Sequence, residues 1–402
     1  MKRIIQRIMF GAVMGIVALP VAAKGVTPNT RFQDQCTDEN KTAWYATFRA
    51  TFKTDQQPKA YEAAKKYLAA CSSEDTQITQ YLKKWVGVYE KEIRKVRLPQ
   101  LLYNDKKYPE AFALGREILA DEPENLRVLI DLGYGGYLAA TAKNNTFNAD
   151  AINYAKKALQ MIESGKTVDN WQPFGNKEEA LAYLNYSIGV LTLPQDPQAA
   201  LSYLIKAAQF QSNLKQLPFT YGYIGGAYEA GPYAKQSEEY KRQFEGKDET
   251  PESKLALANI NQIVDRMVDA YARAVAAAGE KPEFQTSKKE WTDSLSSWYK
   301  YRHNQSDAGM TDMVATILSK PLPPEPTPLT SLPPSAPTST PAAGGGTSSG
   351  ASGAPAGTGS TTNTTTPSGP AKTTTPATTP KGPGTKPASA TGPGRPRSRS
   401  HH

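Results

Sequence analysis

The sequence contains few of the side chains on which metal binding and thiol chemistry depend. Its 402 residues include two cysteines and three histidines, and two of the histidines are the final two residues. His303 is therefore the only histidine elsewhere, and one imidazole cannot build the multi-histidine sites typical of zinc. A lone histidine of this kind more often ends a helix than acts as a general base. We expect no cofactor and no metal.

The patterns of common catalytic and phosphate-binding sites are also absent from the body of the chain. Two glycine-rich stretches, Leu132 to Gly136 and Tyr221 to Gly226, lack both the Rossmann spacing and the Lys-Ser/Thr pair of a P-loop. Each lies within a helical pattern, where glycine allows close packing. Outside the C-terminal low-complexity segment there is no nucleophile elbow and no zinc-hydrolase helix. We therefore expect a protein that is not an enzyme.

The body of the chain lacks an excess of charge, although the whole sequence carries a formal charge of +9. Residues 1–23 contribute three of these charges and residues 321–402 contribute five, which leaves +1 for the body. Nucleic-acid-binding domains present a concentrated basic face to the phosphate backbone. The distribution of charge therefore argues against nucleic acid as a partner.

The sequence lacks an apolar run long enough to span a membrane comfortably. The run from Ile8 to Leu19 is interrupted by glycine, follows three basic residues, and precedes the small residues 21–23. This order is typical of a signal peptide, which we assign to residues 1–23, with an uncleaved anchor as the alternative. Residues 24–35 are then a linker. We expect export to the periplasm or cell envelope, or secretion, and no integral membrane span after cleavage.

Export makes the two cysteines a candidate disulfide. Cys36 lies just before the first expected helix, and Cys71 lies at the end of the second. These two ends lie side by side in an antiparallel helix hairpin, and an oxidising compartment favours their pairing. The alternative is a pair of reduced, buried cysteines.

Helical periodicity is what the sequence has in abundance. Apolar residues recur at helical spacing along most of the body. In the run from Thr76 to Tyr103, Pro99 should kink or interrupt the helix. The other expected helices are 38–52, 58–70, 233–244 after Gly231-Pro232, 251–279, one around 291–299, and 313–319.

Between these helices the chain resembles the tetratricopeptide repeat (TPR), a 34-residue helical hairpin. Leu132-Gly133 is similar to the Leu-Gly pair of a first helix. The second-helix and terminal-proline positions are matched by Tyr108, Ala111, Ile118, Leu119 and Pro123, and again by Ala151, Tyr154, Ala158 and Leu159. The small residues in this pattern let neighbouring backbones approach each other. Ile188-Gly189 and the stretch Tyr221 to Tyr228 repeat it.

The resemblance implies an all-α, TPR-like helical-hairpin solenoid over residues 36–245. Such a stack exposes an apolar face at its end unless further helices cover it. We therefore expect residues 246–320 to form C-terminal capping helices. Residues 321–402, rich in Pro, Thr, Ser and Gly, are expected to be a disordered low-complexity tail that is extended near its start. The tail is a spacer, a target for sugar attachment, or a segment without a specific role.

The TPR resemblance also implies a concave groove, lined by the first helix of each hairpin, that holds extended peptides. The corresponding positions are Arg127, Tyr134, Tyr137, Tyr183, Tyr186, Phe219 and Glu229. Tyrosine offers an apolar face with a polar tip, which suits a peptide or a glycan. The alternative is that these tyrosines only pack between repeats.

Two functional hypotheses follow from this sequence. The first is an exported, non-catalytic TPR scaffold that mediates protein-protein interactions in the cell envelope, with a protein or peptide as its partner. The second is an envelope protein that binds cell-wall glycan or peptidoglycan through a tyrosine-lined groove.

Overall fold

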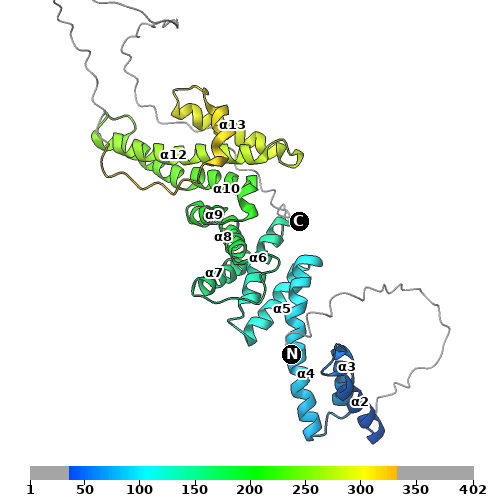
Figure 1. The fold of residues 1–402 in the computed structure, drawn as a ribbon. Coiled ribbons are helices and arrows are strands. Elements are labelled where there is room, and N and C mark those ends of the chain that lie inside the picture. Colours follow the sequence, from blue (N-terminus) through cyan, green and yellow to red (C-terminus); the bar gives the residue numbers. More distant parts are fainter. Residues whose placement is uncertain (1–35, 333–402) are drawn as a thin grey trace, which may run out of the picture. The chain divides into compact units, whose positions relative to one another are not determined.

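The structure is a computed structural model that describes residues 36–332. Within this range all regular elements are helices, so the predicted all-α class is confirmed (Figure 1). None of the helices between residues 36 and 332 combines the length and apolarity that crossing a bilayer requires. The predicted signal peptide, the whole linker, and residues 333–402 of the predicted tail lie outside the described residues.

The chain divides into two compact units, which meet in sequence at Val168 and Asp169. The described helices of the first unit are α2 (Asp38–Thr51), α3 (Gln57–Ala70), α4 (Gln77–Pro99), the π-helical turn η1 (Gln100–Asn104), α5 (Tyr108–Asp121), α6 (Leu126–Thr141) and α7 (Asn148–Glu163).

The first hairpin of this unit is formed by α2 and α3, which lie side by side (Figure 1). The Thr37 side chain caps α2 by accepting a hydrogen bond from the Asn40 backbone N–H. Phe48 is buried in the hairpin core, and its ring meets that of Trp85 from α4 edge to face, with centroids 5.0 Å apart. Cys36 and Cys71 are joined by a disulfide, with their Cα atoms 5.1 Å apart.

Pro99 ends α4, but the chain does not turn away there. It continues as the π-helical turn η1, in which the Asp105 N–H donates to the Gln100 carbonyl oxygen at 2.9 Å. A π-helical turn reaches one residue further along the chain than an α-helical turn, which helps a helix to accommodate a proline. The predicted interruption is therefore a local widening followed by a short connection to α5.

Close approach between α6 and α7 depends on glycine. A Cβ atom added at Gly136 would lie 2.1 Å from the Ala151 Cβ, and one added at Gly133 would lie 2.9 Å from the Ala155 Cα. No side chain larger than hydrogen fits at these two positions without moving the backbones apart. The small residues that were noted in the sequence therefore set the distance between these helices.

The second unit contains α8 (Lys177–Thr192), α9 (Pro197–Gln209), the 3₁₀ turn η2 (Asn213–Gln216), α10 (Pro218–Tyr228), the π-helical turn η3 (Glu229–Tyr233), α11 (Ala234–Phe244), α12 (Pro251–Ala278), the 3₁₀ turn η4 (Pro282–Phe284), α13 (Gln285–Arg302), α14 (Met310–Thr316) and the 3₁₀ turn η5 (Ile317–Ser319). In this unit α8 packs on α9, and α10 packs on both α9 and α12.

The backbone also remains helical across Gly231-Pro232, where the sequence suggested a boundary. The π-helical turn η3 contains Pro232 and joins α10 directly to α11. Gly231 permits this path, because a Cβ atom there would lie 3.0 Å from the Gln198 nitrogen of α9. The expected separate helix after the glycine is instead the continuation of α10.

The long helix α12 organises the second unit. It begins with a capping box formed by Thr250 and Ser253, and Gly279 follows its last turn with a positive φ of 51°. The helix α12 packs on both α10 and α13, and its Met267 is fully buried. Figure 1 shows α10 and α13 lying along this helix.

The start of the predicted disordered tail departs from expectation. Residues 320–332, which we call the strap, form an extended segment alongside α12, drawn in orange in Figure 1. Hydrogen bonds from α12 side chains hold the strap backbone. The extended conformation agrees with the proline content, whereas the expected absence of order does not apply to residues 321–332.

Candidate functional site

In the first unit, the predicted groove residues lie around a buried carboxylate. The Arg127 Nε donates to the Asp131 Oδ2 at 2.9 Å, and the Tyr103 hydroxyl donates to the Asp131 Oδ1 at 2.7 Å. Tyr134 and Tyr137 are half-buried, and their rings stack with centroids 5.9 Å apart. The three predicted residues of this unit are thus close together on α6.

The electrostatics of this cluster are governed by burial. Asp131 is 1% exposed, and burial raises the pKa of its carboxyl, which the charge of Arg127 opposes. Burial, followed by the charge of Asp131, also raises the pKa of Tyr103 well above its ordinary value. These interactions fix the positions of Arg127 and the Tyr103 ring. The Tyr134 ring packs against the Tyr103 ring at a tilt, with the two centroids 6.3 Å apart.

In the second unit, the predicted groove residues have different surroundings. Tyr186 is 1% exposed and belongs to the core, with its ring 6.2 Å from that of Tyr223. Phe219 is half-buried and meets the Trp291 ring edge to face at 5.3 Å.

The two remaining predicted residues of this unit also take part in packing contacts. Tyr183 is half-buried and stacks on Phe174, with the ring centroids 5.4 Å apart. Glu229 accepts a hydrogen bond from the hydroxyl of the buried Tyr271 at 2.7 Å.

A set of polar contacts that sequence reasoning did not identify lies along α12. Three side chains of this helix bind the strap backbone, at positions spaced by seven residues: Asn259, Arg266 and Arg273. We call them the donor ladder. The Arg266 Nε donates to the Pro324 carbonyl oxygen at 2.7 Å. Asn259 donates to the Leu329 carbonyl oxygen at 3.2 Å and accepts from the Leu329 N–H at 2.7 Å.

Arg273 is the most deeply held member of the donor ladder. It is 3% exposed and pairs with Asp269, one turn earlier, at 2.6 Å. Its two Nη atoms donate to the carbonyl oxygens of Lys320 at 3.0 Å and Pro321 at 2.8 Å. Because a buried guanidinium needs a partner for each of its N–H groups, these contacts fix the point where the strap begins.

The spacing of the donor ladder suits an extended peptide. Seven residues of α-helix rise by about 10.5 Å, and three residues of polyproline II by about 9.3 Å. Arg273 and Arg266 contact Pro321 and Pro324, which are three residues apart. The strap therefore runs antiparallel to α12. Its three residues from Pro321 to Pro324 approximately match two turns of that helix, whereas five residues, from Pro324 to Leu329, lie along the next two turns.

The chemistry of the donor ladder also suits a proline-rich segment. The strap contains Pro321, Pro323, Pro324, Pro326 and Pro328, none of which has a backbone N–H. Arginine only donates, and the two arginines contact carbonyl oxygens in the proline-rich part. Asn259 both donates and accepts, and it contacts Leu329, which has an N–H.

Two cavities flank the strap. One, of about 320 Å³, is lined by residues that include Tyr228, Ile263, Pro326 and Pro328. The other, of about 240 Å³, is lined by residues that include Tyr240, Phe244 and Pro328. The buried Tyr228 hydroxyl has no hydrogen-bond partner among the described residues, so it is a donor available to a ligand or a water molecule.

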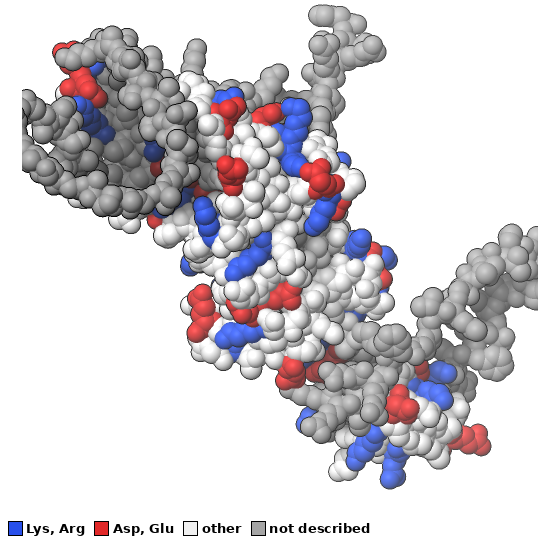
Figure 2. All heavy atoms as spheres, turned by 45° about the horizontal axis from the view of Figure 1, so that its top comes forward, with Lys and Arg blue, Asp and Glu red and all other residues white. Residues whose placement is uncertain are grey.

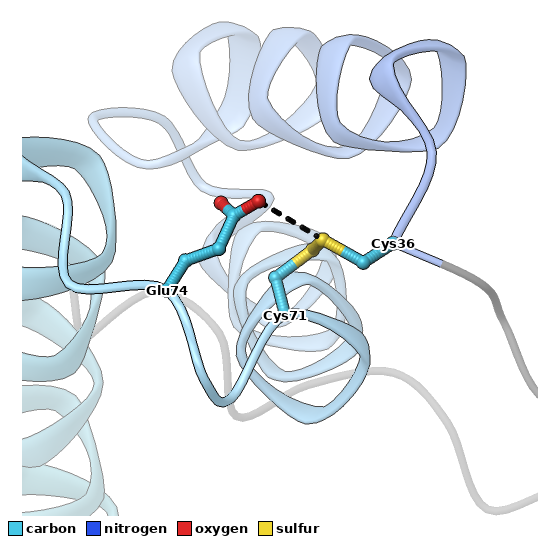
Figure 3. A group of neighbouring side chains, drawn as sticks. All are labelled: Cys36, Cys71 and Glu74. Atoms are coloured by element: carbon cyan, nitrogen blue, oxygen red, sulfur yellow. Dashed lines mark hydrogen bonds between the residues drawn. A yellow bond between two sulfur atoms is a disulfide. The ribbon is translucent and has the colours of Figure 1, made fainter.

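The disulfide region brings together the ligand-type atoms of Cys36, Cys71 and Glu74, within 4.8 Å of one another. Figure 3 shows the Glu74 side chain reaching toward the bonded sulfurs, with its Oε1 3.4 Å from the Cys36 Sγ. The same carboxylate oxygen accepts from the Lys41 Nζ at 3.1 Å. Disulfide sulfurs are not thiolates, so this cluster is not suited to hold a metal in its oxidised form.

The surface charge agrees with the near-neutral body. On the face drawn in Figure 2, acidic and basic side chains are interspersed over the described residues, and no large area carries one sign. Many charged side chains of the described residues are paired, for example Arg302 with Asp265 at 2.6 Å. That face therefore offers no extended basic surface for a phosphate backbone.

No protein-family model, curated protein or solved structure that was compared with the chain matches it.

The spacing of the donor ladder is visible in the sequence. Asn259, Arg266 and Arg273 share one face of α12 at heptad spacing, and Asp269 precedes Arg273 by one turn. Polar residues at this spacing, followed by a proline-rich segment, indicate a helix that binds an extended chain.

Proposed function

We propose that this protein is an exported, non-catalytic scaffold of TPR-like helical hairpins that binds extended segments of partner proteins in the cell envelope. The observation that carries the proposal is the donor ladder of α12 holding the strap. A helix face that binds the backbone of one extended segment provides the chemistry needed to bind another.

Backbone contacts give such a site broad selectivity. The ladder binds carbonyl oxygens, which every residue has, and so it selects conformation more than sequence. Polyproline II is already extended before binding, and less conformational entropy is lost when it docks. Proline-containing segments are therefore the preferred partners in this proposal.

The hairpins support the scaffold part of the proposal. The helix pairs α2/α3, α6/α7 and α8/α9 each pack as neighbours within their own unit. In the proposed solenoid these pairs are three of the repeats, and α10, which packs on α9, is in turn covered by α12. Export rests on the sequence of residues 1–23, and the disulfide is consistent with an oxidising compartment.

A labelled peptide with the sequence of residues 320–332 tests the binding activity. It is titrated against the full chain and against a chain that ends at Ser319, with fluorescence anisotropy as the readout and circular dichroism as the check on folding. We expect saturable binding to the shortened chain and at least tenfold weaker binding to the full chain, where the strap already occupies the ladder.

Two further variants make the result decisive. In the shortened chain, Asn259→Ala should weaken peptide binding, whereas Asn261→Ala, whose amide contacts Tyr301, should not. If the shortened chain does not fold, the full chain in which Pro323, Pro324 and Pro326 are replaced by glycine is used instead. These substitutions weaken the docking of the strap and leave the ladder open to the peptide. A folded protein with an open ladder that leaves the peptide unbound at about 1 mM contradicts the proposal.

The glycan alternative retains one specific observation. Tyr134 and Tyr137 are stacked and half-buried on α6, an arrangement that can bind the apolar face of a sugar. Retention on purified cell-wall polysaccharide that is lost in Tyr134→Ala and Tyr137→Ala would favour this alternative. Retention that is unchanged in both variants would remove it.

A further inference from the structure

A cavity of about 680 Å³ lies in the second unit, beside the C-terminal end of α12. Its walls come from α9, η2, α10, α12, η5 and the strap. The lining includes Lys215, Arg273, Ala277, Lys281, Lys320 and Leu322. This volume is in the range of small-molecule binding sites.

The charged residues that line this cavity are all basic. Among the described residues, Lys215, Lys281 and Lys320 form no ion pair with a carboxylate, and no aspartate or glutamate lines the cavity. Arg273 also lines the cavity, but Asp269 offsets its charge. Lys281 lies over the Phe284 ring at 5.8 Å, a contact that leaves its positive charge uncompensated.

The absence of acidic residues from this lining contrasts with the mixed acidic and basic side chains on the face drawn in Figure 2. The body of the chain as a whole is near neutral. An anion bound in this cavity would lie near three lysines that have no carboxylate partner, and it would be attracted by their charges. Such an arrangement raises the local concentration of anions at the cavity mouth.

We propose that this cavity binds a small molecule with two or more anionic groups, such as phosphates or carboxylates. Lys215, Lys281 and Lys320 contact the anionic groups. The apolar residues Ala277 and Leu322 contact the remainder of the molecule, so the ligand has an apolar part as well. The site is separate from the donor-ladder contacts of Asn259 and Arg266, and the proposal goes beyond the peptide-binding function.

The ligand would also join the strap to the body of the unit. Lys320 and Leu322 belong to the strap, whereas Lys215 belongs to η2 and Lys281 follows α12. A molecule that contacts all of them stabilises the docked strap by the free energy of its binding. Anion binding and strap docking therefore strengthen each other, as linkage requires.

The test uses the full chain at low ionic strength, with pyrophosphate and citrate as separate probes. Isothermal titration calorimetry measures affinity, and amide chemical shifts of Ala277 and Leu322 locate the site. We expect saturable binding with a Kd below about 1 mM for at least one probe. A preference for pyrophosphate identifies a phosphate ligand, and a preference for citrate identifies a carboxylate ligand.

Variants that remove positive charge test whether the cavity is the site at which the anions bind. We expect Lys215→Gln with Lys281→Gln to weaken binding by about tenfold or more, and the corresponding arginine variants to retain it. Lys241→Gln, on an exposed part of α11, removes the same charge outside the cavity and should change the Kd by less than about twofold. Equal effects of the cavity and control variants, or no saturable binding of either probe, would overturn the proposal.

Discussion

Asn259 illustrates how one side chain can recognise a peptide backbone. Its amide forms a pair of hydrogen bonds with the N–H and the carbonyl of Leu329, seventy residues later in the sequence. An amide is suited to this role because its donor nitrogen and its acceptor oxygen are bonded to the same carbon. Arg266 and Arg273, which only donate, contact carbonyl oxygens. The type of side chain thus matches the backbone group that it meets.

We predict that Asn259→Ala speeds hydrogen exchange of the Leu329 amide by about fivefold to tenfold. The variant removes the acceptor of that amide, and a hydrogen bond of this kind contributes about 1 kcal/mol. Nuclear magnetic resonance of the full chain measures the exchange rate. Asn261→Ala, two residues along α12, is the matched control. Unchanged exchange in Asn259→Ala would show that the contact does not protect the strap.

Tyr271 joins α12 to the end of α10 through its hydroxyl. It is 5% exposed and donates to the Glu229 Oε2 at 2.7 Å. Burial, followed by the charge of Glu229, raises the pKa of Tyr271 well above its ordinary value of 10.0. Because the pKa is higher in the folded state, this tyrosine contributes stability below pH 10 that is lost as the pH rises through the folded-state pKa.

We predict that Tyr271→Phe lowers the free energy of unfolding by about 1 kcal/mol at neutral pH, because a hydrogen bond is lost. The variant should also lose less stability than the native protein between about pH 9 and pH 11. Urea denaturation at several pH values measures both effects. Tyr81→Phe, at a residue that is 44% exposed, is the control. A native and a variant protein with parallel pH profiles would contradict the assignment.

At the scale of helices, the distance between neighbours depends on where glycine is placed. Gly136 faces Ala151 across the α6–α7 contact, with no room for a Cβ atom. Gly87, in α4, has no atom within 4 Å of the position that a Cβ would take. The same residue type therefore has a packing role in one helix and none in the other.

These two glycines provide a matched pair of substitutions. We predict that Gly136→Ala destabilises the protein by about 1 to 3 kcal/mol, because the added methyl group overlaps Ala151. Gly87→Ala should stabilise it by about 0.5 to 1 kcal/mol, because alanine restricts the unfolded backbone and favours the helix. Chemical denaturation of both variants measures the difference. A stabilising effect of Gly136→Ala would show that α6 and α7 are less closely packed than described.

Helix positions could be predicted from the sequence because their apolar periodicity is strong. The expected segments 38–52 and 58–70 lie within one residue of α2 and α3. The effects of Pro99 and Pro232 could not be predicted, because a proline either ends a helix or is accommodated by a wider turn, depending on what packs around it. The π-helical turns η1 and η3 are the second outcome.

The strap could not be predicted for a related reason. The amino-acid composition correctly indicates that residues 320–332 bury little apolar surface. It carries no information on the hydrogen bonds that α12, distant in the sequence, donates to this segment. Of the predicted groove residues, Tyr134 and Tyr137 lie together on α6, whereas Tyr186 is in the core. Repeat position indicates which helix carries a residue. Burial also depends on the neighbouring helix, and a single sequence does not specify that contact.

At the scale of the whole molecule, the chain consists of two compact units, and its single disulfide lies entirely in the first. The disulfide closes a loop between residues separated by 35 positions, around the hairpin of α2 and α3. A covalent link of this kind acts mainly on the unfolded chain, whose conformational entropy it reduces. Its effect should therefore appear in the stability of the first unit, while the contacts of α12 lie elsewhere in the sequence.

We predict that Cys36→Ser with Cys71→Ser lowers the stability of the α2–α3 hairpin by about 3 to 4 kcal/mol on the chain-entropy model. Hydrogen exchange with mass spectrometry, in increasing urea, measures this as a loss of protection in the peptides of α3. Peptides of α12 in the same sample serve as the internal reference, because the loop that the disulfide closes does not include them. The native protein treated with a reducing agent should behave like the double variant. Equal protection of α3 in the oxidised and reduced proteins would show that helix packing alone, through Phe48 and Trp85, determines the stability of this hairpin.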